Sequence, residues 1–224
     1  METSPVLHRG LPVPRTLAES LHAVRPALLV YDAQVGIFSQ LPEPAALTAR
    51  LVQIVEAARA AALPILFSRH LSLPVELMGM AQMRMALAWQ RTNDPRQVRP
   101  WFLRDSSGIA ILPEVSPLPS EAVFDKLTMS AFEGTLLDIA LRDLGVQSII
   151  LIGAAMEIGI EPTVRHAADL GYIPVVVRDA CGAGHPEAAQ RALDSLAFAG
   201  DTLFTDTDEL CELLASLPKR TPAI

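Results

Sequence analysis

Short apolar runs alternate with longer amphipathic segments along most of the chain. The runs hold almost no polar positions, which is typical of strands buried on both faces, whereas the segments between them carry apolar residues at helical spacing. The runs predict six strands, at 27–31, 64–68, 122–125, 148–152, 173–177 and 202–205. Strands that alternate with helices favour a parallel sheet covered on both faces and joined by right-handed crossovers.

Helix signals fill most connections between these strands. We expect helices at about 45–62, from Glu157 to Gly171, at 187–199, and from Asp206 onward. Ser130 with Glu133 three residues later has the form of a capping box, which predicts a further helix that ends at Gly145.

The segment 71–121 is less regular. It begins with a methionine-rich helical stretch and continues through five prolines, with Trp89 and Trp101 within it. A long irregular segment in an α/β domain is often a binding loop or an oligomer contact. The methionines favour packing in the core or at a subunit interface, and the two tryptophans are candidates for the wall of a pocket or of such an interface.

The chain has 224 residues, enough for one sizeable α/β domain. We expect an N-terminal arm at 1–20 and a domain at 21–218. The first twenty residues carry prolines and charges where a signal peptide needs an apolar core, and no apolar stretch reaches the length of a membrane span. Two cysteines favour a reducing compartment, so we expect a cytoplasmic protein.

A net charge of −7 and a pI near 5.2 argue against a nucleic-acid partner or an anionic membrane surface, because basic residues are not clustered. Small molecules or proteins are the expected partners. His70 is the only histidine in the region of the second strand and the segment after it, and we expect no metal and no cofactor.

Three chemically useful positions converge if the first and fourth strands are neighbours. Asp32 follows the first strand, Lys126 follows the third, and the turn 153–159 follows the fourth. A carboxylate beside an ammonium group in a partly desolvated cleft is suited to proton transfer. Each residue alone is more often a structural or solvated strand end.

The turn after the fourth strand is where an open α/β sheet places its chemistry. Amides at the start of the following helix favour negative charge, and the centre of this turn is where a nucleophile is expected. The residue at that position is Gly159, which has no side chain with which to attack.

Three stretches of the sequence resemble the isochorismatase-like hydrolases, also called the cysteine hydrolase superfamily. They are LLVYDAQVGIF from Leu28, FDKLTMSAFEG from Phe124 and IILIGAAMEIGIEPTVRH from Ile149. The resemblance covers roughly residues 25 to 215. It implies a three-layer α/β/α, Rossmann-like fold with a six-stranded parallel sheet, and usually dimers or tetramers. The family's catalytic Asp, Lys and Cys fall on Asp32, Lys126 and Gly159. A cis peptide that helps to place an oxyanion hole falls between Ala155 and Met156.

Glycine at position 159 closes the covalent acyl-enzyme route. One branch of the family, the isochorismatases, also has glycine there and cleaves a vinyl ether by proton transfer from the Asp, and Gly159 would leave room for such a substrate. The isochorismatase branch carries aromatic and polar residues in the motif that starts at the Lys and in the turn after the fourth strand. Here these places hold Leu127, Met129 and Ala155-Met156-Glu157. Glu157 resembles the amide-hydrolase branch instead.

The sequence therefore predicts a hydrolase of a small, carboxylated or cyclic metabolite that cleaves a vinyl ether or a related C–O or C–N bond. Asp32 is the expected general acid or base, and Lys126 is its expected electrostatic partner. The backbone amides of 156–159 are expected to hold an anion. These amides follow Ala155 and include that of Met156. Gln34 is expected to support the site, and Trp89 to contact substrate.

Arg69 and His70 are candidates to bind a substrate carboxylate, although an ion pair between Arg69 and an acidic residue explains the arginine equally well. Two other functions stay open. One is a catalytically silent member of the family that binds a metabolite or serves as a structural subunit. The other is an amide hydrolase that uses Cys181, in the segment ACGAGH, with His185 as its base.

Overall fold

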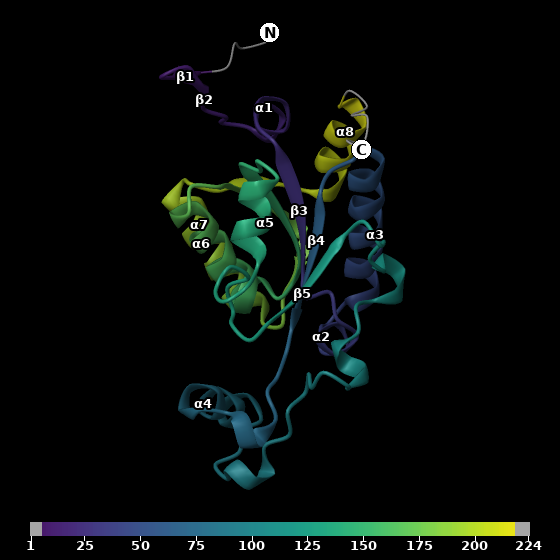
Figure 1. Cartoon of the computed structure of the whole chain (residues 1–224), viewed down its shortest axis with the longest axis vertical. Helices are drawn as coiled ribbons and strands as arrows, with labels where there is room; N and C mark the ends of the chain where they lie inside the picture. Colours follow the sequence, from purple (N-terminus) through teal and green to yellow (C-terminus); the bar gives the residue numbers. More distant parts are fainter. Residues whose placement is uncertain (1–5, 218–224) are drawn as a thin grey trace.

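A six-stranded parallel sheet runs through the middle of the protein in the computed structural model, which describes residues 6–217 (Figure 1). Its order is β5-β4-β3-β6-β7-β8. The strands are β3 (Pro26–Tyr31), β4 (Ile65–His70), β5 (Ala122–Lys126), β6 (Ser148–Ala154), β7 (Ile173–Gly182) and β8 (Leu203–Thr205). All six predicted strands are confirmed, and their pairing is parallel throughout.

The order of the strands reverses between β3 and β6. From β3 the chain winds outward through β4 to β5, and from β6 it winds the other way through β7 to β8. The predicted neighbours, the first and fourth strands, are therefore adjacent. The carboxyl edge at such a reversal is where open α/β sheets bind ligands.

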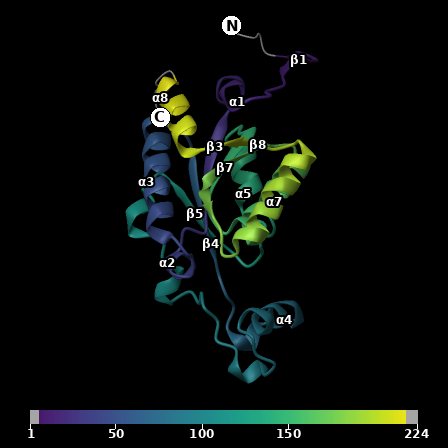
Figure 2. The ribbon, with the colours of Figure 1, turned by 180° about the vertical axis from the view of Figure 1, so that it is seen from behind.

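Helices cover both faces of the sheet (Figures 1 and 2). One layer contains α1 (Leu17–Ala23), α3 (Pro44–Ala60) and α8 (Thr207–Ser216), and the other α5 (Leu137–Asp143), α6 (Glu161–Asp169) and α7 (Pro186–Ala199). In β3, Val30 packs with the first layer, whereas Leu29 and Tyr31 pack with the second. Alternate residues of a strand point to opposite faces, so a strand covered on both sides is apolar throughout.

The predicted capping box at Ser130 and Glu133 is wrong, because α5 begins only at Leu137. The Ser130 hydroxyl instead lies 2.9 Å from His166 Nδ1 on α6 and accepts a hydrogen bond from the Phe132 amide at 3.3 Å. The cap residue is thus used by a tertiary contact, and 130–136 forms turns.

The helix predicted from Glu157 begins with a single π-helical turn, η5 (Met156–Ile160), which leads into α6. A short helix, α2 (Val35–Phe38), follows β3. Before the sheet, β1 (Leu7–His8) and β2 (Leu11–Pro12) form a small antiparallel hairpin. Helix α1 then begins inside the segment predicted as an arm, with Leu17 and Ser20 buried. Residues 1–5 and the predicted domain boundary at 218 lie outside the described residues.

The segment 71–121 extends from the carboxyl edge of the sheet to the end of the molecule farthest from α1 (Figures 1 and 2). It contains α4 (Met80–Trp89) and four short 3₁₀ turns: η1 (Val75–Leu77), η2 (Pro95–Gln97), η3 (Ser107–Ile109) and η4 (Pro113–Val115). No residue of α4 is buried. The methionine-rich helix is therefore not part of this chain's core, and its role in a subunit interface stays a prediction.

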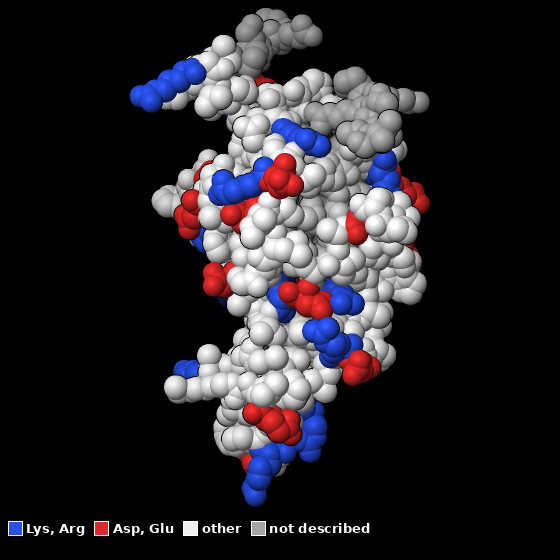
Figure 3. All heavy atoms as spheres, viewed as in Figure 1, with Lys and Arg blue, Asp and Glu red and all other residues white. Residues whose placement is uncertain are grey.

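Acidic and basic side chains are interspersed on the face shown in Figure 3. Among the described helices, none combines the length and apolar character that a membrane crossing requires.

Candidate active site

Asp32 lies directly after β3, at the reversal point of the sheet, and is 3 % exposed. Its Oδ1 accepts a hydrogen bond of 2.6 Å from Ser68 Oγ on β4, and its Oδ2 accepts one of 2.7 Å from Lys126 Nζ. The backbone of Asp32 is left-handed, with φ of 44°. Asp tolerates this conformation better than most residues, and such backbone strain is found preferentially at functional sites.

Lys126 reaches Asp32 from two strands away. It ends β5, in register with His70 of β4, which lies between β5 and β3. Its ammonium group is completely buried; it also donates to Thr128 O at 3.1 Å and lies 4.3 Å from the centre of the Tyr31 ring. These contacts compensate for the loss of hydration that a buried ion pair suffers.

Strands β3 and β6 approach closely at Gly153, which has φ of 123°. A Cβ atom at this position would lie 1.9 Å from the Tyr31 carbonyl oxygen. Only glycine fits here, and its presence brings the turn after β6 against the end of β3.

Gly159 also lacks room for a side chain, but for another reason. A Cβ at Gly159 would lie 1.8 Å from the hydroxyl oxygen of Tyr31 and 2.4 Å from the ring carbon that bears it. The expectation that Gly159 leaves room for substrate is therefore wrong, because the phenol fills that space. Tyr31 is 2 % exposed, and its hydroxyl donates a hydrogen bond to the Met129 carbonyl.

Burial, and next the nearby Asp32 carboxylate, raise the pKa of the Tyr31 phenol well above its ordinary value. The side chain is consequently a neutral phenol at physiological pH. It is a hydrogen-bonding group rather than an anionic nucleophile.

The turn η5 directs several amides at one carbonyl. The amides of Ile158, Gly159 and Ile160 donate to Ala155 O at 3.3, 3.0 and 3.2 Å. A substrate anion at these amides would have to compete with that carbonyl. The cis peptide joins Ala154 to Ala155, one residue earlier than predicted. A cis bond without proline has no local sequence signature, so its position was taken from resemblance alone.

A cavity of about 600 Å³ opens above Asp32 and Gly159. This volume is typical of sites for small ligands. The lining residues include Tyr31, Asp32, His70, Trp89, Arg91, Trp101, Phe102, Met129, Ala155, Glu157, Gly159 and His185. The sheet edge thus supplies the floor, and the segment 71–121 supplies part of the wall.

Two predicted substrate contacts, Trp89 and Ala155, lie on this wall, whereas Met156 does not line the cavity. Met156 is 1 % exposed and packs in the core under α6, because it begins the turn with its side chain toward the sheet. The indole of Trp89 is stacked on that of Trp101, with the ring centres 6.5 Å apart.

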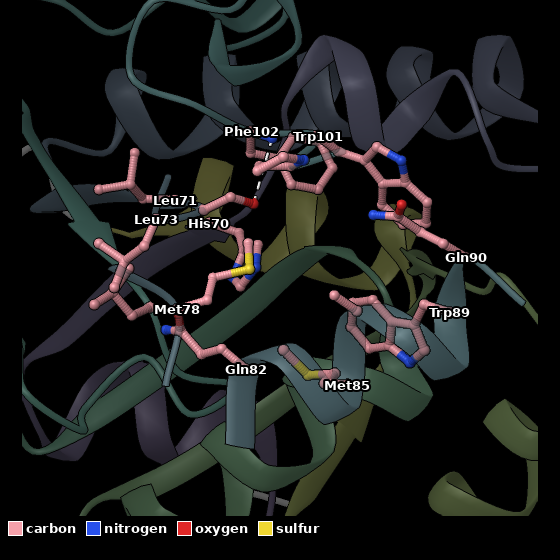
Figure 4. Close-up of a pocket in the computed structure, with 14 residues that line it drawn as sticks. His70, Leu71, Leu73, Met78, Gln82, Met85, Trp89, Gln90, Trp101 and Phe102 are labelled. Atoms are coloured by element: carbon pink, nitrogen blue, oxygen red, sulfur yellow. Dashed lines mark hydrogen bonds between the residues drawn. The ribbon is translucent and has the colours of Figure 1, made fainter. Parts of the chain in front are cut away.

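A smaller pocket of about 50 Å³ adjoins the main cavity and shares His70, Trp89, Trp101 and Phe102 with it (Figure 4). Figure 4 shows side chains of α4 facing the chain that leaves β4.

Gln34 is completely buried and does not line the cavity. Its Oε1 accepts from the His70 amide at 2.6 Å and its Nε2 donates to the His70 carbonyl at 3.1 Å. The side chain therefore ties the end of β3 to the end of β4, which fixes His70. This arrangement is consistent with a supporting role and not with substrate contact.

Arg69 lies outside the cavity and is paired with Asp125, with Nε 2.7 Å from Oδ1. Arg69 points away from the site because His70, the next residue of β4, points toward it. The arginine that lines the cavity is Arg91, which follows α4.

His70 is 9 % exposed and its ring packs edge-on against Phe102. Burial, and next the Lys126 ammonium, lower the pKa of His70 to about 4. The imidazole is therefore neutral near pH 7 and can donate or accept one hydrogen bond at the cavity.

Cys181 and His185 are held by different partners. Cys181 Sγ donates to Leu151 O at 3.5 Å, whereas His185 Nδ1 accepts from the Ala188 amide at 3.4 Å. Burial, and next Asp179, raise the pKa of the Cys181 thiol. Cys181 lines a separate pocket near α3, not the main cavity. This geometry does not support a reactive thiolate at Cys181.

Glu157 projects from η5 into the cavity wall. Its Oε1 accepts from the amides of Gly184 and His185 at 2.9 and 2.7 Å. Its Oε2 is buried and has no hydrogen-bond partner within residues 6–217. In the same part of the chain, no three His, Cys, Asp or Glu side chains are grouped as metal ligands would be.

Sequence reasoning did not single out Tyr31, Ser68 or Arg91. Tyr31 and Ser68 lie within or at the end of predicted strands, where strand position alone does not say which side chains meet. Arg91 lies in the irregular segment, so its proximity to Asp32 depends on how that segment folds back.

Comparisons with known proteins agree with this geometry. The model of the isochorismatase domain matches residues 26–208. Ureidoacrylate amidohydrolase RutB of Methylobacterium radiotolerans is 29 % identical over 187 residues, which are 78 % of this chain and 69 % of the relative.

Two solved structures are also similar. An isochorismatase family protein from Burkholderia thailandensis is 29 % identical with a TM-score of 0.69, and the match covers 85 % of this chain and 96 % of that one. A cysteine hydrolase from Pseudomonas syringae is 23 % identical with a TM-score of 0.72, over 96 % of this chain and 99 % of that one. The sheet, the site and these matches together show that the chain belongs to the isochorismatase-like hydrolases.

Proposed function

We propose that this protein hydrolyses a C–N or C–O bond of a small carboxylated metabolite, with water rather than a side chain as the nucleophile. The observation that carries the proposal is the buried Asp32–Lys126 pair, in which Asp32 lines the cavity beside a glycine at the nucleophile's position. Proton transfer by the carboxylate remains available there, whereas covalent attack from residue 159 does not.

Asp32 transfers the proton. Each of its oxygens already accepts one hydrogen bond, and each keeps a further lone pair for water or substrate. In hydrolysis of a C–N bond, Asp32 takes a proton from water as the water oxygen bonds to the carbonyl carbon. The same proton passes to the leaving nitrogen as the C–N bond breaks, so that one water is consumed and Asp32 is restored.

In hydrolysis of a vinyl ether, Asp32 first donates a proton and later accepts one, the reverse of its order in C–N hydrolysis. Asp32 in its acid form protonates the enol carbon, where that proton stays, and water bonds to the resulting cation. One proton of this water then goes to the leaving oxygen as the C–O bond breaks, and the other goes to Asp32, which restores its acid form. The RutB relative is a ureidoacrylate amidohydrolase, and this likeness supports C–N hydrolysis as the first reaction to test.

Arg91 and His70 are the proposed contacts of the substrate's polar groups. Arg91 is the cation on the cavity wall and is suited to a carboxylate. His70, neutral near pH 7, is suited to a hydrogen bond with an uncharged oxygen or nitrogen. Trp89 and Trp101 add apolar walls. The amides of η5 are the proposed anion holders, with those of Ile158 and Gly159 released from Ala155 O on binding.

The proposal is tested with a panel of ureido acids, carboxylated amides and vinyl ethers. For any compound that is turned over, Asp32→Asn is expected to lower kcat by about 10²–10⁴-fold, the usual contribution of a positioned acid or base. Asn also tolerates the left-handed backbone, but it leaves the Lys126 ammonium buried without its counter-ion, so circular dichroism and urea unfolding are used to check that the variant is folded in the assay. Unchanged turnover in Asp32→Asn contradicts the proposal.

Direct attack by water is checked separately with hydroxylamine. A covalent acyl-enzyme would partition to a hydroxamate, whereas attack by water alone gives only the acid. Alkylation of Cys181 is expected to leave activity intact. Hydroxamate formation that disappears in Cys181→Ala would instead support the thiol route. A panel without turnover, combined with stabilisation by a bound panel compound, would support the silent metabolite-binding function.

We also propose a cytoplasmic homo-oligomer, a dimer or tetramer. Exposed apolar side chains of the segment 71–121, such as Leu77, Met80 and Trp101, support an interface there, and the two free cysteines support a reducing compartment. Light scattering of the purified protein tests the oligomeric state, and a monomer at all concentrations contradicts it.

A further inference from the structure

Tyr31 occupies the space that a nucleophilic side chain on η5 would need. Its hydroxyl oxygen lies 1.8 Å from the position of a Cβ on Gly159, far inside van der Waals contact. Tyr31 also lines the cavity together with Asp32. The site therefore has an oxygen atom, contributed by β3, close to where the first atoms of a side chain on Gly159 would be.

The phenol is held there from several sides. Its hydroxyl donates to the Met129 carbonyl, and the Lys126 ammonium lies 4.3 Å from the ring centre. Gly159 is held in turn, because Thr163 Oγ1 donates to its carbonyl at 2.6 Å. Since the O–H bond is directed at Met129, the lone pairs of the oxygen stay available as acceptors.

We propose that Tyr31 is a catalytic residue that takes the missing nucleophile's place by binding the attacking water, which donates one hydrogen bond to the phenolic oxygen and the other to Asp32. This inference rests on the proposed hydrolysis by water and names the group that orients that water. Two fixed acceptors hold both protons of the water and leave a lone pair of its oxygen directed at the substrate, which lowers the entropic cost of attack.

The step balances without any further reactant. The water oxygen bonds to the substrate carbon, and the proton that faces Asp32 goes to Asp32 and then to the leaving atom. The proton that faces Tyr31 stays on the water oxygen and becomes the O–H of the product or is exchanged with solvent. Tyr31 itself gains and loses nothing, which agrees with a phenol that stays neutral throughout.

Replacement of the hydroxyl alone is the first test. The chain has two tyrosines, and Tyr172, which is also buried but does not line the cavity and whose hydroxyl donates to Asp138 at 2.9 Å, gives a matched control. Tyr31→Phe is expected to lower kcat at least tenfold with KM within about twofold, whereas Tyr172→Phe leaves both unchanged.

The two proposals fail in different ways in this experiment. Wild-type kcat in Tyr31→Phe, with loss of activity in Asp32→Asn, overturns the role of Tyr31 and keeps hydrolysis by Asp32. Unchanged activity in both variants overturns both. A rise in KM with kcat unchanged also overturns the water-binding role, because it places Tyr31 in substrate binding only.

A second test keeps the fold intact if Tyr31→Phe is unstable. In the Tyr172→Phe background Tyr31 is the only tyrosine, so biosynthetic 3-fluorotyrosine labels it alone. Fluorine makes the phenolic oxygen a weaker hydrogen-bond acceptor, so kcat is expected to fall at neutral pH, where the buried phenol is not ionised. An unchanged kcat overturns the proposal.

The occupancy of the space is tested without any substrate. Gly159→Ala is expected to lower the unfolding midpoint in urea, because the added methyl collides with Tyr31. Tyr31→Val is expected to remove that penalty, whereas Tyr31→Phe is not, since the ring carbons lie only 2.4 and 2.7 Å from the Cβ position. If Gly159→Ala costs as much in the Tyr31→Val background as in the wild type, the pairing of these residues is overturned.

Discussion

The floor of the cavity and its outer wall are built in different ways. The floor, at the ends of β3 and β6, consists of residues that are nearly completely buried, such as Asp32, which is fixed by hydrogen bonds from Ser68 of β4 and Lys126 of β5. The wall comes from the segment 71–121, where α4 has no buried residue and Trp89 is 41 % exposed.

We propose that the floor carries out the chemistry and that the wall recognises the substrate. Buried, hydrogen-bonded groups keep the reacting atoms in place and make the floor intolerant of change. An exposed segment can change its side chains with little effect on the core. We therefore expect changes in the floor to alter stability and kcat, and changes in the wall to alter KM.

The largest effect is expected for Lys126→Met. The substitution leaves the Asp32 carboxylate buried without its partner, which typically costs about 3–5 kcal/mol of unfolding free energy. Arg59→Met is the control, because Arg59 forms a partly exposed ion pair with Glu121 at 2.8 Å that should contribute about 1 kcal/mol. Urea unfolding measures both. Equal losses would show that the floor is no more sensitive than an ordinary ion pair.

The next effect is a dependence of stability on pH that arises from His70. Its pKa is about 4 in the folded protein, below the ordinary value of 6.5, so the unfolded chain binds more protons between these values. Stability is therefore full above pH 6.5 and is lost as pH falls toward 4. Between about pH 7 and pH 5 the loss from this group is about 2 kcal/mol.

His70→Phe should remove this part of the pH dependence, because the ring is replaced by one that does not titrate. His22→Gln, at an exposed position, should leave it as in the wild type. Urea unfolding at the two pH values gives the comparison, and an unchanged slope in His70→Phe would contradict the assignment.

The smallest effect is expected for the wall. Trp89→Ala removes a stacked indole from the cavity and should raise KM about tenfold, or about 1.4 kcal/mol of binding, with kcat nearly unchanged. Met80→Ala, at a position that is 88 % exposed and does not line the cavity, is the control. A large loss of kcat in Trp89→Ala would place the wall in the chemical step and end the distinction from the floor.

The strands and the two residues of the buried Asp32–Lys126 pair were predictable because each depends on local pattern. Six apolar runs gave six strands, and strand ends gave Asp32 and Lys126. The capping box at Ser130 failed although its local pattern was correct, because His166, 36 residues later, binds the same hydroxyl. Arg69 was a reasonable candidate by position, but Asp125 on the adjacent strand pairs with it.

The sequence by itself determined the parallel α/β sheet, the family and the absence of a nucleophilic side chain at Gly159. Only the tertiary structure decided what fills that place. Tyr31 and Gly159 are 128 positions apart, and their contact depends on the close approach of β3 and β6 at Gly153. Hydrophobic periodicity specifies which residues are buried, but contacts between side chains from distant strands depend on register and packing, which are properties of the assembled sheet.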